Sequence, residues 1–458
     1  MRLLLALLLL SFQARGATFW ATDAGAGSRN GSSLDNAALG WYDTDITGVL
    51  APGDTIYLCG EFVVNSALTP AVSGSAGSYV TYDGSCPGGA QGILNRTGGG
   101  TRLSVSGTTD RDYIWIKDVK FTGATGADNV FITSSDVSNW KFTGNTFDTS
   151  TSGRRGIRWQ GADVYIANNT FTNITGNAIY TTLAPRGIIE NNTLTNVGTS
   201  GAGSNTDGIA VDDGSPNTIV RFNNIVGVRG TDSAGIDVQD NTTVGAGTDL
   251  VYGNFIKDSD GYGISAVNGA GGQEIWNYGN IVINATSASF IAKGAAPLYF
   301  WNNDSQSGSN TLAYHFRCGN STEGTSTFTF TNNVFSGTAS RTGYVNGIGA
   351  TCVDNDNRYP VGGTFASAAD NDLSLSEWTA AVAATNSAEI ADPGFIGGTS
   401  PTSAAGFKLK AGSALRRAGT DLNIGNLQDA GNRAFHHRPS SGAWEAASGD
   451  TAETRPLR

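Results

Sequence analysis

A short unit that combines alternating apolar residues with one or two asparagines recurs along this chain. The clearest copies read WKFTGNTF at Trp140–Phe147, VYIANNTF at Val164–Phe171 and IENNTL at Ile189–Leu194. Later copies centre on Asn224, Asn254, Asn280, Asn303 and Asn333, at steps of 23 to 32 residues. One such unit is too short to bury its apolar face alone. The repeat therefore predicts a fold in which successive units stack on one another.

The repeat favours a parallel β-solenoid over other all-β or mixed folds. No stretch between the units has helical periodicity, so strand–helix–strand units are excluded. A closed antiparallel sandwich would not repeat one strand–Asn–strand order eight times. In a solenoid each repeat forms one coil, stacked about 4.8 Å from the next. Asn suits the bends because it tolerates a left-handed backbone, and stacked Asn amides can hydrogen-bond from coil to coil.

Composition and the N-terminus predict an exported protein. A net charge of −11 argues against a nucleic-acid partner, which needs a basic surface. Residues 1–16 combine one Arg, a run of Leu and Ala14-Arg15-Gly16, which is typical of a signal peptide cleaved after Gly16. The apolar run is too short to span a bilayer, and no later run is long enough. Four cysteines then suggest two disulfides. Sequence order favours Cys59–Cys86 and Cys318–Cys352, although three connectivities are open.

With these repeats, the chain resembles the right-handed parallel β-helix proteins of the pectin-lyase-like superfamily. The segments Ala51–Leu58 and Ser73–Tyr82 resemble the opening strands of such proteins, and Asp392–Phe395, Phe407–Ser413 and Gly442–Glu445 resemble their closing segment. The resemblance implies an all-β, right-handed parallel β-helix. We expect a signal peptide at 1–16, an N-terminal cap and first coils at 17–92, coils at 93–352, and a coil remnant and C-terminal cap at 353–458. Because most enzymes of this superfamily act on polysaccharides, we expect a secreted, monomeric protein with a polysaccharide partner.

A second recurring unit, a small residue followed by an apolar one, predicts which side chains face outward. Period-2 alternation places the first and third residues after the apolar one on the outer surface. The first outward column is then Arg158, Tyr180, Ala210, Asp237, Ser265, Ile291 and His315. The second is Gln160, Thr182, Asp212, Gln239, Val267, Lys293 and Arg317. This face gathers carboxylates, cations and a Tyr, so we treat it as the candidate active site.

Glycoside hydrolysis is the first hypothesis for this face. Asp212 and Asp237 lie one coil and one pleat pair apart; combining about 4.8 Å with about 6.6 Å gives about 8 Å. That separation fits the roughly 6.5–9.5 Å of an inverting glycosidase. Asp207, Asp213 and Asp232 at nearby turns could join the pair. The resemblance to polygalacturonases is partial. Asn205–Ile209 matches one of their motifs, but Tyr262 stands where they have His, and Ile291-Ala292-Lys293 lacks the Arg of their Arg-Ile-Lys. We therefore do not expect true polygalacturonase activity.

β-Elimination from a uronate polymer is the second hypothesis. Lys293 would act as the base, with Arg317 in the same column lowering its pKa, because a like charge disfavours protonated Lys. Asp213 and Asp240, together with Asp212 and Asp237, could supply oxygen ligands for Ca²⁺, which stays an open alternative. The sequence holds no Glu-x-Glu signature at the spacing that such lyases show.

A solenoid that only binds sugar is the third alternative. Arg158, Tyr180, Tyr262 and His315 are the candidate substrate-binding residues, with the tyrosines stacking on pyranose faces. Trp159 is predicted to point inward and therefore to belong to the core. The sequence leaves the sugar, its linkage and the choice among these three functions open.

Overall fold

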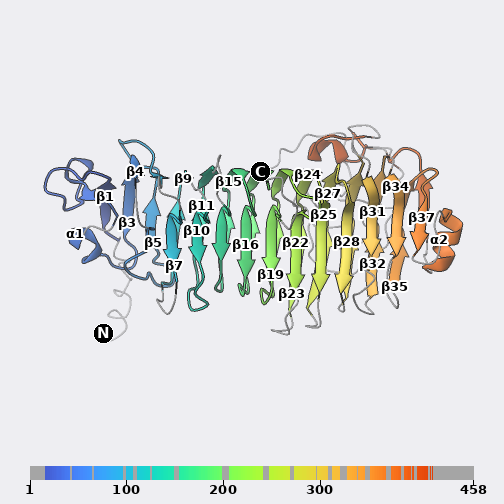
Figure 1. Cartoon of the computed structure of the whole chain (residues 1–458), viewed down its shortest axis with the longest axis horizontal. Helices are drawn as coiled ribbons and strands as arrows, with labels where there is room; N and C mark the ends of the chain where they lie inside the picture. Colours follow the sequence, from blue (N-terminus) through green and yellow to red (C-terminus); the bar gives the residue numbers. More distant parts are fainter. Residues whose placement is uncertain are drawn as a thin grey trace, which may run out of the picture.

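The fold is a long parallel β-solenoid, as the repeat predicts, in a computed structural model of the chain (Figure 1). The structure describes residues 16–415 except 42–43, 64–66, 96–99, 107–110, 124–125, 149–153, 199–205, 241–246, 269–272, 295–296, 308–311, 320–326, 338, 346–350, 368–372, 383–385, 394, 397–399, 411–412 and 414. The predicted signal peptide and Gly442–Glu445 therefore lie outside the described residues. No helix among the described residues is long and apolar enough to cross a membrane.

Three parallel sheets run the length of the described molecule. Sheet A contains β1 (Thr18–Thr22), β2 (Ala38–Leu39), β3 (Thr55–Cys59), β5 (Val80–Asp83), β8 (Ile114–Lys117), β11 (Lys141–Thr143), β14 (Tyr165–Ala167), β17 (Ile188–Glu190), β20 (Ile219–Arg221), β23 (Thr248–Tyr252), β26 (Glu274–Tyr278), β29 (Leu298–Trp301), β32 (Thr327–Thr331) and β35 (Thr351–Asn355). Sheet B contains β4 (Glu61–Val63), β6 (Ile93–Asn95), β9 (Lys120–Thr122), β12 (Thr146–Asp148), β15 (Thr170–Ile174), β18 (Thr193–Val197), β21 (Asn224–Val228), β24 (Phe255–Ser259), β27 (Ile281–Ile283), β30 (Asp304–Gln306), β33 (Val334–Ser336), β36 (Arg358–Pro360) and β38 (Ala388–Ile390). Sheet C contains β7 (Leu103–Val105), β10 (Val130–Ile132), β13 (Ile157–Trp159), β16 (Ile179–Thr182), β19 (Ile209–Asp212), β22 (Ala234–Asp240), β25 (Tyr262–Asn268), β28 (Ala288–Gly294), β31 (Leu312–Cys318), β34 (Ala339–Val345) and β37 (Phe365–Ser367).

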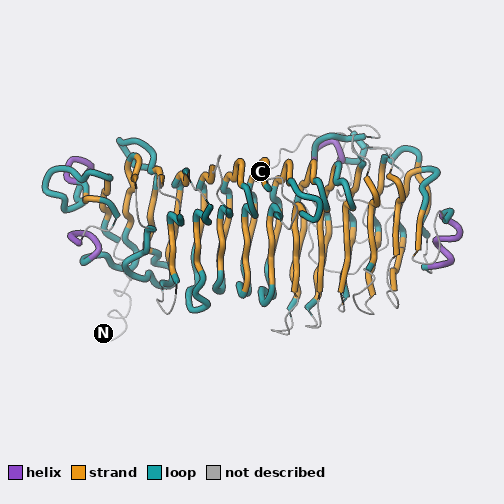
Figure 2. The backbone as a smooth tube through the Cα atoms, viewed as in Figure 1, coloured by secondary structure: helices purple, strands orange, loops and turns teal. Residues whose placement is uncertain are grey.

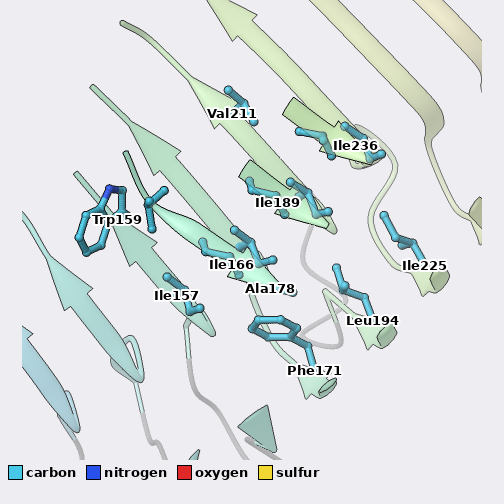
Figure 3. Close-up of a cluster of buried hydrophobic side chains, with 14 of the residues drawn as sticks. Ile157, Trp159, Ile166, Phe171, Ala178, Ile189, Leu194, Val211, Ile225 and Ile236 are labelled. Carbon is cyan, nitrogen blue, oxygen red and sulfur yellow. The ribbon is translucent and has the colours of Figure 1, made fainter. Parts of the chain in front are cut away.

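From β5 to β37, each coil contributes one strand to each sheet, and the strands pair with their counterparts in the neighbouring coils (Figure 2). The described helical segments are short. They are η1 (Leu34–Asn36), α1 (Thr44–Thr47), α2 (Leu375–Ala381) and η2 (Ala404–Phe407). The side chains that point inward from the three sheets form one continuous apolar core (Figure 3). Within it, the rings of Phe121, Phe147 and Phe171 stack with centroids 4.6 Å apart.

A ladder of buried asparagines runs along the turn between sheets A and B. Its members are Asn145, Asn169, Asn192, Asn223, Asn254, Asn280, Asn303, Asn333 and Asn357. The Asn169 amide Nδ2, for example, donates to Asn192 Oδ1 at 3.0 Å and to the Phe142 carbonyl at 2.9 Å. The predicted coil-to-coil amide bonding is therefore confirmed. One repeat centre needs correction, because the ladder uses Asn223, whereas Asn224 is exposed and begins β21.

The left-handed bend and the ladder fall on different residues. In most of these turns, the residue just before the ladder Asn has a positive φ, for example 57° at Asn168, 54° at Asn191 and 50° at Asn302. In other coils Gly fills that place, as at Gly253 and Gly279. The Asn-Asn pairs of the sequence thus combine two functions: the first Asn bends the backbone and the second bonds to the next coil.

The small residue that precedes each apolar residue of sheet C lies at a corner of the coil. A Cβ on Gly235 would stand 2.5 Å from Ile256 Cγ2, and one on Gly263 would stand 2.4 Å from Val282 Cγ1. In these two coils the corner is filled from sheet B, so a side chain on Gly235 or Gly263 would clash there.

Two disulfides, Cys59–Cys86 and Cys318–Cys352, join neighbouring coils, which confirms the favoured pairing. At the C-terminal end, α2 starts with a capping box formed by Ser374 and Glu377. Its Trp378 is fully buried against Phe316 and Phe365. Because a solenoid end would otherwise expose its core, α2 acts as the cap of the described coils.

Candidate functional site

The outward face of sheet C carries the side chains that the sequence singles out. Strands β13, β16, β19, β22, β25, β28 and β31 lie side by side along this face (Figure 1). The pairing register defines one outward column of Arg158, Tyr180, Ala210, Asp237, Ser265, Ile291 and Arg317. A second column contains Val267 and Lys293, and Asp212 lies opposite Thr182. The first predicted column is thus confirmed up to Ile291, and the second is confirmed for Thr182 with Asp212 and for Gln239, Val267 and Lys293.

The last strand of the face departs from the prediction. Arg317 pairs with Ile291 rather than with Lys293, so it belongs to the first column. When the repeats of this chain are matched by sequence, Tyr314 falls at the inward position of Phe290, whereas the structure places Phe316 there. The hypothesis that Arg317 lowers the pKa of Lys293 as its partner in one column is therefore wrong.

His315 lies inside the solenoid instead of on the predicted outer column. It occupies the corner position of β31, which corresponds to Gly263 of an earlier coil, and it is fully buried. Space for its ring exists because Ser305 of sheet B replaces the bulkier Val282 of the previous coil. Ser305 Oγ lies 2.7 Å from His315 Nδ1. Burial lowers the pKa of His315 to about 3, so the ring is neutral and does not serve substrate binding.

Three carboxylates converge near the middle of the face, and we call Asp207, Asp212 and Asp237 the carboxylate cluster. Asp207, at the turn before β19, is buried and accepts hydrogen bonds from the Ala234 N–H at 2.7 Å and from Asn177 Nδ2 at 3.1 Å. The sequence analysis named it only as a neighbour, because the period-2 rule does not place turn residues. Its position beneath the two outward carboxylates makes it part of the site.

The cluster holds its members in different protonation environments. Desolvation raises the pKa of Asp237 to about 6, against the effects of the Ser265 hydrogen bond and the Lys293 charge, and the Asp212 charge adds to the rise. Burial, and secondarily the Asp237 charge, raises the pKa of Asp207 well above its usual value. A carboxyl that titrates near neutrality can give or take a proton during a reaction.

Asp212 is fixed by donors rather than by burial. The Tyr180 hydroxyl donates to Asp212 Oδ2 at 2.7 Å, and the Asp213 N–H donates to Asp212 Oδ1 at 2.9 Å. Tyr180, whose substrate binding stays a prediction, thus has its hydroxyl bound to this carboxylate. The guanidinium groups of Arg155 and Arg158 lie 4.6 and 5.9 Å from the centre of its ring.

Cations occupy both flanks of the carboxylate cluster. On one flank, partly buried Arg155 pairs with Asp128 at 3.5 Å and lies beside Arg158. On the other flank, Lys293 Nζ lies 5.4 Å from the centre of the Tyr262 ring. The Arg317 charge acts on the same Tyr262 hydroxyl, where it opposes the rise in pKa that burial causes. Tyr262, Lys293 and Arg317 therefore form one group.

The architecture has clear counterparts among known proteins. A family model described as the right handed beta helix region matches residues 103–305. The chain thus has the fold of a right-handed parallel β-helix. A pectate lyase structure, Pel9A, aligns over 94% of this chain and 96% of its own with a TM-score of 0.53 and 17% identity. A complex of XylC with xylose aligns over 76% of this chain and 86% of its own with a TM-score of 0.54 and 11% identity. A search of curated proteins finds no match.

Calcium ligation in this β-helix protein stays a prediction. Among the described side chains, no three His, Cys, Asp or Glu residues are placed to hold a metal ion. The backbone of Asp240 pairs with Asn268 in β25, but its side chain lies outside the described residues. Asp213 follows β19 and uses its N–H to bond Asp212. The described geometry thus provides carboxylates for proton transfer, flanked by cations.

Proposed function

We propose that this β-helix protein acts outside the cytoplasm and hydrolyses a polysaccharide on the outward face of sheet C. The carboxylate cluster carries the proposal, because two outward carboxylates on adjacent coils occupy unlike environments. Asp237, with its pKa near 6, would serve as the general acid. Asp212, held by Tyr180 and by the Asp213 N–H, would serve as the general base for water. The two disulfides support export, since such bonds persist in oxidising compartments.

The lyase alternative receives less support. Lys293 lies beside the carboxylate cluster, where its charge acts on Asp237, and among the described residues it does not share a column with a second cation. Arg317 lies in the other column, one coil beyond. Elimination would still be recognised by unsaturated sugar ends that absorb ultraviolet light, and these ends would be lost in Lys293→Ala.

The test is the release of reducing ends from a panel of polysaccharides by the full chain. We expect Asp237→Asn to lower kcat by about 10³-fold or more without unfolding, because it removes the proton donor. The parent rate should fall as pH rises through about 6, because the acid form of Asp237 is needed. The matched control is Asp163→Asn, a carboxylate of a distant turn paired with Arg186, which should keep full activity. Full activity in Asp237→Asn would refute the assignment.

A further inference from the structure

A second surface, around the corner from the carboxylate cluster, is rich in aromatic side chains. On the outward face of sheet A, strands β23, β26 and β29 present six outward positions. They hold Leu250, Tyr252, Trp276, Tyr278, Tyr299 and Trp301, which we call the aromatic strip. The next coil places Thr329 and Thr331 at these positions, and the preceding coil places Ile219 and Arg221 there. The aromatic rings at the six positions therefore come from three adjacent coils.

The rings of the strip pack against one another along the solenoid axis. The Tyr252 and Tyr278 rings are stacked 4.7 Å apart, and the Tyr299 and Trp301 rings lie 4.9 Å apart. Tyr252, Tyr278 and Trp301 are buried by this packing, whereas Trp276 and Tyr299 remain partly exposed. The two exposed rings come from adjacent coils and lie 6.2 Å apart.

Polar groups border the rings. The Arg221 guanidinium pairs with Glu190 at 2.5 Å and donates to the Tyr252 hydroxyl at 2.7 Å. Glu274 Oε2 accepts a hydrogen bond from Trp276 Nε1 at 3.0 Å. Apolar ring faces beside hydroxyl and carboxylate groups suit a pyranose, which has an apolar face and a rim of hydroxyls.

The dimensions of the strip favour a linear polymer over a second protein. Three coils at about 4.8 Å and two columns about 6.6 Å apart define a patch on the order of 100–200 Å². A stable protein interface buries about 800 Å² on each partner. The strip is also continuous in sequence with the candidate site. Strands β22, β25 and β28, which carry Asp237, Tyr262 and Lys293, lead directly into β23, β26 and β29.

We infer that the aromatic strip is a non-catalytic binding site for a polysaccharide chain, with Trp276 and Tyr299 as its contact residues. It would hold the polymer on the coils whose sheet C strands carry Asp237, Tyr262 and Lys293. Binding there does not depend on cleavage, so this inference and the proposed hydrolysis can fail separately.

Affinity gel electrophoresis tests the inference, with polygalacturonate, alginate or xylan cast in the gel and Asp237→Asn as the parent, so that no polymer is cut. We expect at least one polymer to retard the parent, and Trp276→Ala with Tyr299→Ala to weaken that retardation by about tenfold. The control is Trp115→Ala. Trp115 is a partly buried Trp of the same outward column, near Lys141, and its loss should leave retardation unchanged.

A second pair, Trp276→Leu with Tyr299→Leu, keeps the strip apolar but removes the ring faces, and it should show the same loss. Unchanged retardation in the folded Leu pair, or a parent that none of the three polymers retards, would overturn the inference. So would a dimer of the parent in light scattering that the Leu pair dissociates, because the strip would then be an interface between two copies.

Discussion

At the scale of single residues, one face of the solenoid places three aspartate carboxyl groups in different surroundings. Asp212 accepts hydrogen bonds from the Tyr180 hydroxyl and the Asp213 N–H. Asp237 interacts with the Ser265 hydroxyl through a hydrogen bond and with the Lys293 charge, and Asp207 is buried. Pairs of titratable groups whose surroundings push their pKa values apart mark acid and base assignments. The arrangement comes from β19 and β22, whose strand pairing sets Asp237 opposite Ala210, two residues before Asp212.

Replacing Asp237 should also change stability in a pH-dependent way. A carboxyl whose pKa is raised in the folded state is a cost once it ionises, so stability falls as pH rises from about 4 to about 6. We expect Asp237→Asn to raise the free energy of unfolding by about 1–2 kcal/mol at pH 8, since one pKa unit is worth about 1.4 kcal/mol and the site is partly exposed. The gain should vanish near pH 4. Denaturant titrations at both pH values measure it, and an equal gain at both would contradict the shift.

The sequence predicted the outward direction of those site residues for which strand periodicity alone decides the direction. Asp212, Asp237 and Lys293 point outward because alternation fixes their side of the strand. The same alternation predicts only which side of the strand a side chain faces. It does not predict which residue of the neighbouring strand lies opposite. It therefore misplaced Arg317 and His315, where Tyr314 and Phe316 compete for one inward position. Asp207 was underweighted for a related reason, since it stands in a turn and its burial depends on Asn177 and the Ala234 N–H.

At the scale of the structural element, the turn between sheets A and B specifies the coil. Its first residue bends the backbone, and the ladder Asn then bonds to the coils on both sides. The repeat was visible in sequence because this double requirement selects Asn so often. The exact ladder position was not visible at Asn223-Asn224, because two adjacent asparagines look alike and only burial distinguishes them.

These two neighbours provide a matched pair of variants. Asn223→Ala should lower the free energy of unfolding by about 3 kcal/mol, because Asn192 Nδ2 and the Ile189 carbonyl lose their partner inside the protein. Asn224→Ala, at an exposed position, should stay within about 0.5 kcal/mol of the parent. Urea unfolding of the full chain measures both, and equal losses would show that the ladder adds no stability.

At the scale of the whole molecule, the repeat predicts that the coils stack, but it does not predict the ends. The periodic sequence predicted the solenoid and its core, because every coil obeys the same inward pattern. The cap at α2 has no such period, and its role depends on Trp378 reaching Asp354 and the last aromatic layer. Sequence alone could say only that some segment must cover the end.

Removing that cover should destabilise the molecule and make it associate. We expect Trp378→Ala to cost about 4 kcal/mol, as for large aromatic side chains lost from a core, and to produce oligomers through the opened end. Chemical denaturation and size-exclusion chromatography measure the two effects. Trp115→Ala, on the outer surface, should give a monomer of nearly parental stability. A monomeric, fully stable Trp378→Ala protein would show that α2 is not the cap.

The asparagine ladder also has a direction, since each amide from Asn145 to Asn333 donates one N–H to the ladder Asn of the following coil and the other to a carbonyl of the preceding coil. Its last member, Asn357, donates to Asp354 Oδ1, and the same carboxylate receives the hydroxyl of Tyr359, the indole of Trp378 and the hydroxyl of Ser387. With four donors already attached, Asp354 offers nothing to the start of another stack. Extending the ladder into an end-to-end copy would need a free amide N–H on Asn357, but its Nδ2 already donates to the Phe330 carbonyl and to Asp354, so the chemistry that joins the described coils also ends the ladder at Asn357.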